Sequence, residues 1–384
     1  MIKNTTPIIE IHGTGIHNRG AELMAIAISE KIWSLYPNAK IVVPSTFGFP
    51  SDISRYGFFT SSTLELLAKR AVFSLTIAGL TGKIIKSKKV DVVLDASGFA
   101  FSDQWGEYFP KHLFQKMIAK HRVHQSLILM PQALGKFEKK DVSDWTKKLF
   151  SRADIVFARD EQSYKYSEPL IDLSNKLKLS PDFTIAVKPL ENSSIQLPEK
   201  FVAIVPNLRM LDKSDDPEAY LNFLKKSIEL ILKNGLVPLF LIHDAKEDLK
   251  VVATLGENYS NIEAIQHQDP RVLKWILGQA QFVIGSRFHA LVSTMSQGVP
   301  CIGAGWSHKY PELFADFSNR DGLIDNLADL TSLEKQITIF SNQVTYVERS
   351  KQIQSAANEL KNKVDQMWKL IIENINQHLE KKVN

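Results

Sequence analysis

The stretch QFVIGSRFHALVSTMSQGVPCIGAGWSHK, residues 281–309, contains the clearest strand–helix–strand pattern in the chain. A short apolar run at residues 282–284 ends at a Gly-Ser pair, which is typical of a buried strand. Residues 288–297 predict a helix that stops at Gly298, and residues 299–303 predict the next strand. Because right-handed crossovers join parallel strands, the pattern predicts an α/β fold built on parallel sheets.

Basic side chains follow both predicted strands of this stretch. Arg287 and His289 come directly after the first strand, and Lys309 lies in the loop after the second. Open parallel sheets bind ligands outside the carboxyl ends of their strands. Arg grips a carboxylate or phosphate through two hydrogen bonds, and His exchanges a proton near neutral pH. Together they predict a site for an anionic substrate that needs acid–base help, although each residue alone is also consistent with a structural role.

Length and composition predict a globular protein of two domains. The 384 residues exceed one ordinary core, since domains usually hold about 100–200 residues. The apolar share of 44% and the charged share of 23% are those of a soluble protein. The net charge of +5 comes from 47 basic and 42 acidic residues that are scattered along the chain. This mild charge favours small anionic ligands and argues against a nucleic-acid partner.

The single cysteine and the hydropathy pattern indicate the compartment. Cys301 alone excludes an intramolecular disulfide framework and a cysteine-built zinc site. The N-terminus lacks the apolar run of a signal peptide, and no run of about 18 apolar residues predicts a membrane span. Residues 71–80, AVFSLTIAGL, are consistent either with contact at a membrane surface or with a core helix. We expect a cytoplasmic protein with at most peripheral contact at the inner face of the cell membrane.

A glycine-containing loop follows the first predicted strand, residues 8–11, and precedes a predicted helix at 21–36. Glycines let a backbone approach a ligand closely, and a helix N-terminus offers free N–H groups to an anion. The dinucleotide fingerprint fails because position 18 is Asn and no acidic residue ends the next strand, residues 41–44. The loop at 12–20 therefore predicts either a ligand loop of another kind or a structural turn.

A second loop of interest, residues 96–106, follows a predicted strand at 90–95. Carboxylates beside aromatic rings suit sugar hydroxyls and sugar ring faces. Asp95, Asp103 and Trp105 are therefore candidates for contacting a sugar acceptor, and the segment is equally consistent with an ordinary packed loop.

Polar, proline-containing residues 188–200 mark the predicted domain boundary. We predict an N-terminal domain at 1–190, a C-terminal domain at 200–340 and a helical tail at 341–384 that packs back on the first domain. Arg159 follows a predicted strand of the first domain, residues 154–158. Arg209 follows the first predicted strand of the second domain, residues 201–205.

The motif Gly285-x-Arg287-x-His289, followed by Gly298-Val299-Pro300 and Lys309, resembles the C-terminal motif of the polysaccharide pyruvyl transferase family. The resemblance extends over roughly residues 10–312. Other segments follow the family's order: Asn18-x-Gly20-Ala21-Glu22, Arg159-Asp160-x-x-Ser163, Pro181-Asp182 and Pro206-Asn207-x-Arg209. Where many members carry a glycine pair after the third strand, this chain has Ser97-Gly98, which puts the identity of the acceptor in doubt.

The resemblance implies two Rossmann-like domains that face a cleft, similar to the GT-B architecture. It also implies phosphoenolpyruvate as donor and a sugar or glycan, free or lipid-linked, as acceptor. The product would be a pyruvate ketal on a cell-surface polysaccharide or its precursor, with release of phosphate. This scheme needs no cofactor and no metal.

Residue roles follow from matching this chemistry to the motif. Phosphoenolpyruvate carries a carboxylate and a phosphate, so it needs at least two cationic groups. Candidates for binding it are Arg287, Lys309, Arg209 and Arg159. His289 is the candidate general acid/base, with Arg287 beside it as the second catalytic residue. The candidates for binding the acceptor are Asn18, Glu22, Asp95, Asp103 and Trp105.

Two other function classes remain open from sequence. A GT-B-type glycosyltransferase that uses a nucleotide sugar would show the same two-domain pattern. A non-catalytic glycan-binding relative would share the fold as well. The Arg287, His289 and Lys309 set argues against the second class, because a binding module needs no proton-transfer group.

Overall fold

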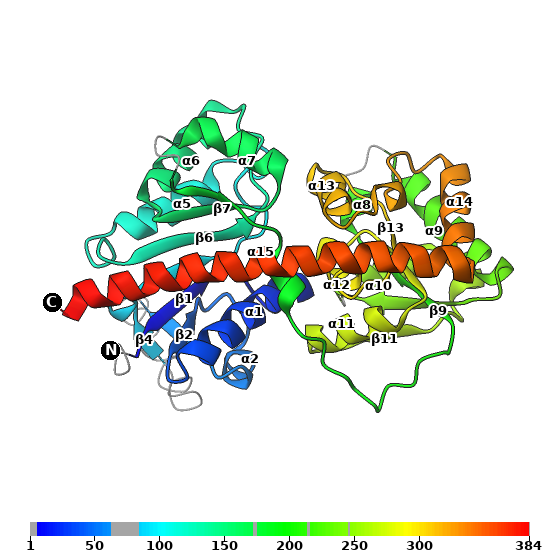
Figure 1. Cartoon of the computed structure of the whole chain (residues 1–384), viewed down its shortest axis with the longest axis horizontal. Coiled ribbons are helices and arrows are strands. Elements are labelled where there is room, and N and C mark those ends of the chain that lie inside the picture. The colour runs from blue at the N-terminus through cyan, green and yellow to red at the C-terminus, as the bar shows by residue number, and fades with distance from the viewer. Residues whose placement is uncertain (1–5, 63–83, 172–174, 213–215, 245, 384) are drawn as a thin grey trace. The chain divides into compact units, whose positions relative to one another are not determined.

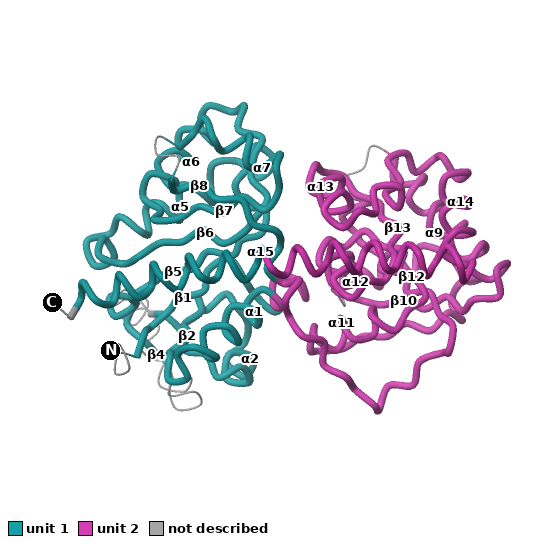
Figure 2. The backbone as a smooth tube through the Cα atoms, viewed as in Figure 1, with its two compact units in different colours: residues 1–17, 24–183, 363–384 teal, residues 18–23, 184–362 magenta. Residues whose placement is uncertain are grey.

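The computed structural model of the chain describes residues 6–62, 84–171, 175–212, 216–244 and 246–383. These form two compact units (Figure 2). Unit 1 contains Met1–His17, Met24–Phe183 and Lys363–Asn384, and unit 2 contains Asn18–Leu23 and Thr184–Asn362. Neither unit is one continuous segment, because Asn18–Leu23 belongs to the second unit and the C-terminal tail is divided between the two.

Unit 1 is built on an eight-stranded sheet in which every neighbouring pair is parallel. Its strands run in the spatial order β4 (Ile84–Lys86), β3 (Phe59–Ser62), β2 (Lys40–Val43), β1 (Ile8–His12), β5 (Val92–Asp95), β6 (Ser126–Gln132), β7 (Ile155–Ala158) and β8 (Leu177–Leu179). The central strands β5 and β6 are buried along their whole length. Such continuous burial is expected where helices cover both faces of a parallel sheet.

Unit 1 has five α-helices among the described residues besides the end of α15. They are α1 (Arg19–Leu35), whose first residues belong to unit 2, α2 (Pro50–Arg55), α5 (Tyr108–Ile118), α6 (Lys140–Arg152) and α7 (Glu161–Ser167). Leu113 and Met117 of α5 and Leu149 and Phe150 of α6 join one core cluster with alternate residues of β5, β6 and β7. Short 3-10 turns lie at Ser87–Lys89, Glu168–Leu170 and Phe183–Ala186.

Unit 2 repeats the scheme with a five-stranded parallel sheet (Figure 1). The spatial order is β11 (Ala264–Gln266), β10 (Val237–Ile242), β9 (Phe201–Val205), β12 (Phe282–Gly285) and β13 (Cys301–Gly303). Alternate residues of β9 enter two different core clusters: Ala203 and Val205 pack into one, and Val202 and Ile204 pack into the other. The sheet is therefore covered on both faces.

Helices of unit 2 divide between these two clusters. The helices are α8 (Arg209–Asp212), α9 (Pro217–Lys233), α10 (Asp248–Thr254), α11 (Pro270–Gln279), α12 (Phe288–Met295), α13 (Lys309–Asp316), α14 (Leu330–Ser341) and the first part of α15 (Gln343–Val383). α11, α12, α13 and α15 contribute to one cluster, and α9, α10 and α14 contribute to the other. Short 3-10 turns lie at Glu257–Tyr259 and Arg320–Gly322.

In each sheet the strand order reverses once. In unit 1 the chain passes outward from β1 through β2, β3 and β4, then returns to the other side of β1 at β5. In unit 2 it passes from β9 through β10 and β11, then returns to the other side of β9 at β12. At such a reversal the connections leave adjacent strands in opposite directions, so the carboxyl ends of the two strands stay accessible to ligands.

The 41-residue helix α15 is the long helix at the C-terminal end of the chain (Figure 1). Its first part packs in unit 2, where Ser350 Oγ donates to Gly298 O at 2.8 Å and Lys361 Nζ donates to Ser296 O at 2.9 Å. Its last part packs in unit 1, where Ser126 Oγ donates to Asn374 Oδ1 at 2.8 Å.

The predicted α/β class with parallel sheets and a long C-terminal helix is confirmed. The strand–helix–strand prediction for residues 281–309 corresponds to β12, α12 and β13. Residues 71–80 lie outside the described residues. None of the described helices combines the length and the apolar content that a membrane crossing requires.

A buried ion cluster lies inside unit 1 on β1. Glu10 is fully buried, and its two carboxylate oxygens accept from Lys116 Nζ at 2.5 Å and from Arg122 Nη2 at 2.9 Å. Arg122 is also buried and donates to Gln125. Burial alone would raise the pKa of Glu10, but Lys116 and Arg122 outweigh it and lower the pKa to about 2. The cluster therefore stabilises the folded state only while Glu10 is ionised.

We predict that Glu10→Gln lowers the free energy of unfolding at pH 7 by about 3 kcal/mol, because it leaves Arg122 buried without a counter-charge. The pKa of Glu10 falls on folding, so its contribution is complete above the unfolded value near 4.5 and is lost as the pH falls toward 2. Urea denaturation across this pH range should show a steeper loss in wild type than in the variant. The control Glu138→Gln, at an exposed side chain, should change stability by less than about 0.5 kcal/mol. An equal effect of both substitutions would contradict the prediction.

Candidate functional site

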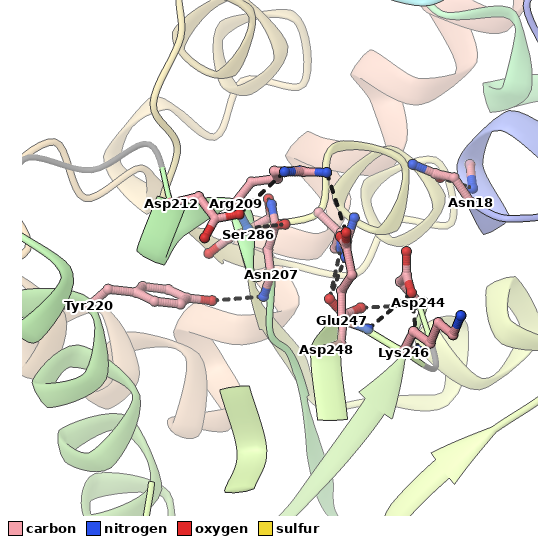
Figure 3. A network of polar contacts seen from close by, with 12 residues as sticks. Asn18, Asn207, Arg209, Asp212, Tyr220, Asp244, Lys246, Glu247, Asp248 and Ser286 are labelled. Carbon is pink, nitrogen blue, oxygen red and sulfur yellow. Dashed lines mark hydrogen bonds and ion pairs between the residues drawn. The ribbon is translucent and has the colours of Figure 1, made fainter. Parts of the chain in front are cut away.

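A network of polar contacts joins the ends of β9 and β12, where the strand order of unit 2 reverses (Figure 3). Asn207, two residues after β9, donates from Nδ2 to the carbonyl of Ser286 at 2.8 Å, directly after β12. The hydroxyl of Tyr310 donates to the same carbonyl at 2.9 Å. Tyr220 accepts from the backbone N–H of Asn207 at 3.1 Å, and burial raises the pKa of Tyr220 to about 12. The two strand ends are thus held together by neutral groups.

Arg287 is the central cation of this site. It occupies the N-cap position of α12 in an extended backbone conformation. Its Nε donates to Asp248 Oδ1 at 3.2 Å, its Nη2 donates to the same oxygen, and Nη2 lies 3.7 Å from Glu247. The Arg287 side chain is 12% exposed, and Asp248 is fully buried. Burial opposes the charge, but Asp248, Asp244 and Glu247 outweigh it and raise the pKa of Arg287, so the guanidinium stays charged.

The Asp248 carboxylate is itself held by the backbone. Its Oδ2 accepts from the N–H of Asp244 at 2.9 Å, in the turn between β10 and α10. Asp244 in return accepts from the N–H of Glu247 at 3.1 Å. The side chain that orients Arg287 therefore has little freedom of its own. Of the donors of Arg287, those on Nη1 have no acceptor among the described residues, which leaves them for a ligand.

Arg209 lies on the same side of the network but is more exposed. Its side chain is 43% exposed and forms ion pairs with Asp212 at 3.2 Å and Glu247 at 3.3 Å. Its backbone N–H donates to Asn207 Oδ1 at 3.1 Å. Glu247 thus contacts both Arg209 and Arg287.

His289 projects from the first turn of α12 and packs against the start of α1. A Cβ atom at Gly20 would lie 2.3 Å from Nδ1 of His289, so this position admits only glycine. Asn18 caps α1 by accepting from the backbone N–H of Gly20 at 2.8 Å. Glu22 is fully buried and forms an ion pair with Arg19. The segment Asn18–Leu23, which carries two of the predicted acceptor-binding residues, therefore packs against His289 within unit 2.

His243, the first residue after β10, is a second histidine of the site. It is 9% exposed, and its Nε2 has no hydrogen-bond partner among the described residues. Burial and the nearby positive charges of Arg287, His289 and Arg19 lower the pKa of His243 to about 3. His243 is therefore neutral at physiological pH and offers a hydrogen-bonding nitrogen without adding charge.

Lys309, at the start of α13, is surrounded by aromatic rings. Its Nζ lies 4.9 Å from the ring centre of Trp306, 5.3 Å from Tyr310 and 5.6 Å from Phe288. Cation–π contacts of this kind restrain a flexible lysine. Phe288 directly precedes His289, and Tyr310 donates a hydrogen bond to Ser286. The aromatic rings around Lys309 are therefore connected to the residues of the site.

The other predicted residues lie in unit 1. Arg159 is 5% exposed and forms an ion pair with Asp182 at 3.2 Å. Asp103 accepts from the backbone N–H groups of Glu138 at 2.7 Å and Lys139 at 3.1 Å, before α6. Trp105 is 38% exposed. The roles of these residues in ligand binding stay predictions.

Asp95 is fully buried at the end of β5. Its carboxylate accepts from Ser97 and is joined to His12. Cys301 is buried in β13, where burial raises the pKa of its thiol. The described residues contain no group of three or more His, Cys, Asp or Glu side chains that could hold a metal ion.

Several residues of the site could not be identified from local sequence patterns. Asp248 and Glu247 open α10, 39 and 40 residues before Arg287, and no local pattern links them to it. His243 was detectable only as one more polar residue at a strand end. Together these residues give unit 2 a charged guanidinium of fixed orientation, a partly exposed histidine and a neutral buried histidine. This arrangement can bind an anion and move a proton beside it.

A family model described as polysaccharide pyruvyl transferase matches residues 18–308, most of the chain. No curated protein matches the sequence. The structure resembles S. aureus MnaA in its UDP co-structure, with a TM-score of 0.60 and 13% identity over 97% of each chain.

Two further structures have the same fold. UDP-GlcNAc 2-epimerase from Neisseria meningitidis, bound to UDP-GlcNAc, has a TM-score of 0.59 and 14% identity over 96% of this chain and 100% of its own. HepE from Anabaena, in complex with UDP and glucose, has a TM-score of 0.59 and 11% identity over the same shares. At these identities the likeness shows a shared GT-B-like fold.

We predict that Asp248→Asn lowers the free energy of unfolding by about 3 kcal/mol, because it removes the counter-charge of a buried guanidinium. Urea denaturation monitored by tryptophan fluorescence would measure the change. Asp212→Asn is the matched control, since Asp212 also pairs with an arginine but is 43% exposed, and it should cost less than about 1 kcal/mol. Similar losses of unfolding free energy in the two variants would show that the Arg287–Asp248 pair stabilises the fold no more than an exposed ion pair does.

Proposed function

Because the chain belongs to the polysaccharide pyruvyl transferase family, we propose that it transfers the enolpyruvyl group of phosphoenolpyruvate to sugar hydroxyls. The acceptor is a cell-surface polysaccharide or its precursor, free or lipid-linked, and the product is a pyruvate ketal. The protein acts in the cytoplasm, on substrates that include those at the inner face of the cell membrane. No cofactor or metal enters the proposed scheme.

The observation that carries this proposal is the pairing of Arg287 with His289 at the start of α12. Asp248 fixes the guanidinium and leaves its Nη1 donors for a ligand, and Gly20 packs on the ring of His289. A guanidinium suits the carboxylate or the phosphate of phosphoenolpyruvate through paired hydrogen bonds. Arg209 and Lys309 supply further positive charge in the same unit. Arg159 stays a candidate for binding the same substrate, with its guanidinium paired to Asp182 in unit 1.

In the proposed reaction His289 protonates the methylene carbon of phosphoenolpyruvate. Positive charge then develops at the adjacent carbon, which a sugar hydroxyl attacks. Loss of phosphate and attack by a second hydroxyl close the ketal. Correctly placed acid–base groups typically contribute a factor of about 10²–10⁴ to such steps. Fixed positive charges near the phosphate stabilise its departure.

A second candidate function is transfer or modification of a sugar from a nucleotide donor. The observation in its favour is that the structures with the same fold were solved with UDP, UDP-GlcNAc or UDP and glucose. Thermal-shift measurements separate the two candidates. Stabilisation by phosphoenolpyruvate and none by UDP or UDP-GlcNAc supports pyruvyl transfer, and the reverse pattern supports the second candidate.

The proposed activity is tested most directly in cells. Mass spectrometry of the cell-envelope glycans should detect pyruvate ketals in the wild-type strain and none after deletion of the gene. The glycan fractions of the deletion strain, both lipid-linked and polymeric, then serve as acceptors in vitro. Unchanged ketal content after deletion would refute the proposal.

We predict that His289→Ala lowers phosphate release from phosphoenolpyruvate plus acceptor by at least about 10²-fold, because it removes the proton donor. Circular dichroism should show an unchanged fold. His121→Ala, at an exposed position of unit 1, is the control and should retain activity. Activity of His289→Ala within a few-fold of wild type would make the assignment wrong.

We predict that Arg287→Lys weakens phosphoenolpyruvate binding by at least about ten-fold in calorimetry. Lysine keeps the positive charge beside buried Asp248, so the fold should survive, but it loses the planar pair of donors. Lys246→Ala, in the neighbouring turn and exposed, should leave the dissociation constant unchanged. An unaltered dissociation constant for Arg287→Lys would remove Arg287 from the donor site.

A further inference from the structure

We propose that His12 is the general base that takes the proton from the acceptor hydroxyl, and that Asp95 is the residue that positions it. This inference rests on the proposed pyruvyl transfer and assigns a second site for it, in unit 1.

The location of the pair is the first argument. His12 ends β1 and Asp95 ends β5, and the two residues are directly opposite each other in the strand register. The strand order of the sheet reverses between β1 and β5. The pair therefore occupies the place in unit 1 that the Asn207–Ser286 contact occupies in unit 2, where parallel sheets bind their ligands.

The environment of Asp95 is the second argument. Its carboxylate is fully buried, and Oδ2 lies 3.0 Å from His12 Nδ1 and accepts from Ser97 Oγ at 3.0 Å. The other oxygen accepts from the backbone N–H of Ser97 at 3.3 Å and from Gln132 Nε2 at 3.4 Å. Both oxygens are thus occupied, which fixes the carboxylate and prevents it from contacting a sugar itself. What Asp95 can do is accept the Nδ1–H of His12.

The contact with Asp95 assigns the tautomer of His12. When a carboxylate accepts from Nδ1, the neutral imidazole carries its proton there and its lone pair is on Nε2. The His12 side chain is 20% exposed, and no group among the described residues bonds to its Nε2. The nitrogen that can take a proton is therefore the one left for a ligand. A carboxylate behind the ring also stabilises the imidazolium that forms when the base takes a proton.

The residue directly after His12 must be a glycine. Gly13 has a φ of +76°, and a Cβ atom there would lie 2.2 Å from Ser97 Oγ. A side chain at residue 13 is thus excluded. Charged and titratable groups that interact with His12 include Glu10 on its own strand, Asp95 on β5 and His112 on α5. Burial, together with His12 and Lys116, lowers the pKa of His112.

The proton balance of the reaction gives His12 a defined step. As the first hydroxyl oxygen bonds to C2 of phosphoenolpyruvate, its proton passes to Nε2 of His12, and C3 gains a proton to become a methyl group. The C2–O bond to phosphate then breaks, and the second hydroxyl oxygen bonds to C2 and loses its proton. The two hydroxyls release two protons in all. One replaces the proton that C3 received, and the other leaves with phosphate. No oxidant, reductant or further reactant is needed.

The alternative is that the pair only holds the loop after β5 in place. His12→Asn distinguishes a general base from a structural residue. The Asn side chain can still donate to Asp95 but has no basic nitrogen. Ketal formation is measured with phosphoenolpyruvate and the glycan fractions of the deletion strain. We expect a kcat at least about 10²-fold below wild type, while the dissociation constant for phosphoenolpyruvate changes by less than about two-fold. His124→Asn, at an exposed histidine of unit 1, is the control.

Two further variants test the roles more sharply. His12→Ala should regain activity when imidazole is added, which a structural role would not produce. Asp95→Asn should lower kcat by at least about ten-fold and leave the KM for phosphoenolpyruvate within about two-fold, because the His12 ring loses the carboxylate that orients it. Wild-type-like turnover in His12→Asn, or no rescue of a folded His12→Ala, overturns the base assignment alone. A wild-type protein that neither binds phosphoenolpyruvate nor forms ketals overturns the proposed function, and the assignment with it.

Discussion

The single reversal of strand order in each sheet is the constraint on which both polar sites depend. Where β1 meets β5, and where β9 meets β12, the connecting chain leaves in opposite directions and leaves two strand ends uncovered. Backbone groups and side chains at those ends must then bond to each other or to a ligand. Unit 2 resolves this with the contact from Asn207 to Ser286, and unit 1 resolves it with His12 and Asp95. The sites follow from topology, and the side chains then determine their chemistry.

The two sites differ in how they use charge. In unit 2 a guanidinium is buried beside Asp248, where desolvation offsets much of the attraction, so the pair contributes more to orientation than to stability. The result is a cation of fixed orientation whose Nη1 donors are left for a ligand. In unit 1 the buried carboxylate faces an imidazole that is charged only after it takes a proton. One site is suited to holding an anion, and the other is suited to accepting a proton.

Local signals in the sequence were sufficient for the fold and for part of the site. Apolar runs such as residues 201–205 and 282–284 predicted strands correctly, because continuous burial in a parallel sheet leaves a continuous apolar pattern. Arg287 and His289 were found because they directly follow a strand. Asp248 and His12 were not, since their partners lie 39 and 83 residues away and pairing over such distances leaves no periodic trace. The contact of Gly20 with His289 was hidden for the same reason.

The interleaved chain path has an evolutionary consequence. Residues Asn18–Leu23 sit in the unit that carries His289, and Lys363–Asn384 sit in the unit that carries the N-terminal sheet. A single genetic crossover near residue 184 would therefore give a chimera in which Gly20 and His289, or Ser126 and Asn374, came from different parents. The two units of related proteins therefore cannot be exchanged as simple cassettes. New specificities in such a chain are more readily gained by substitutions within each unit than by shuffling the units.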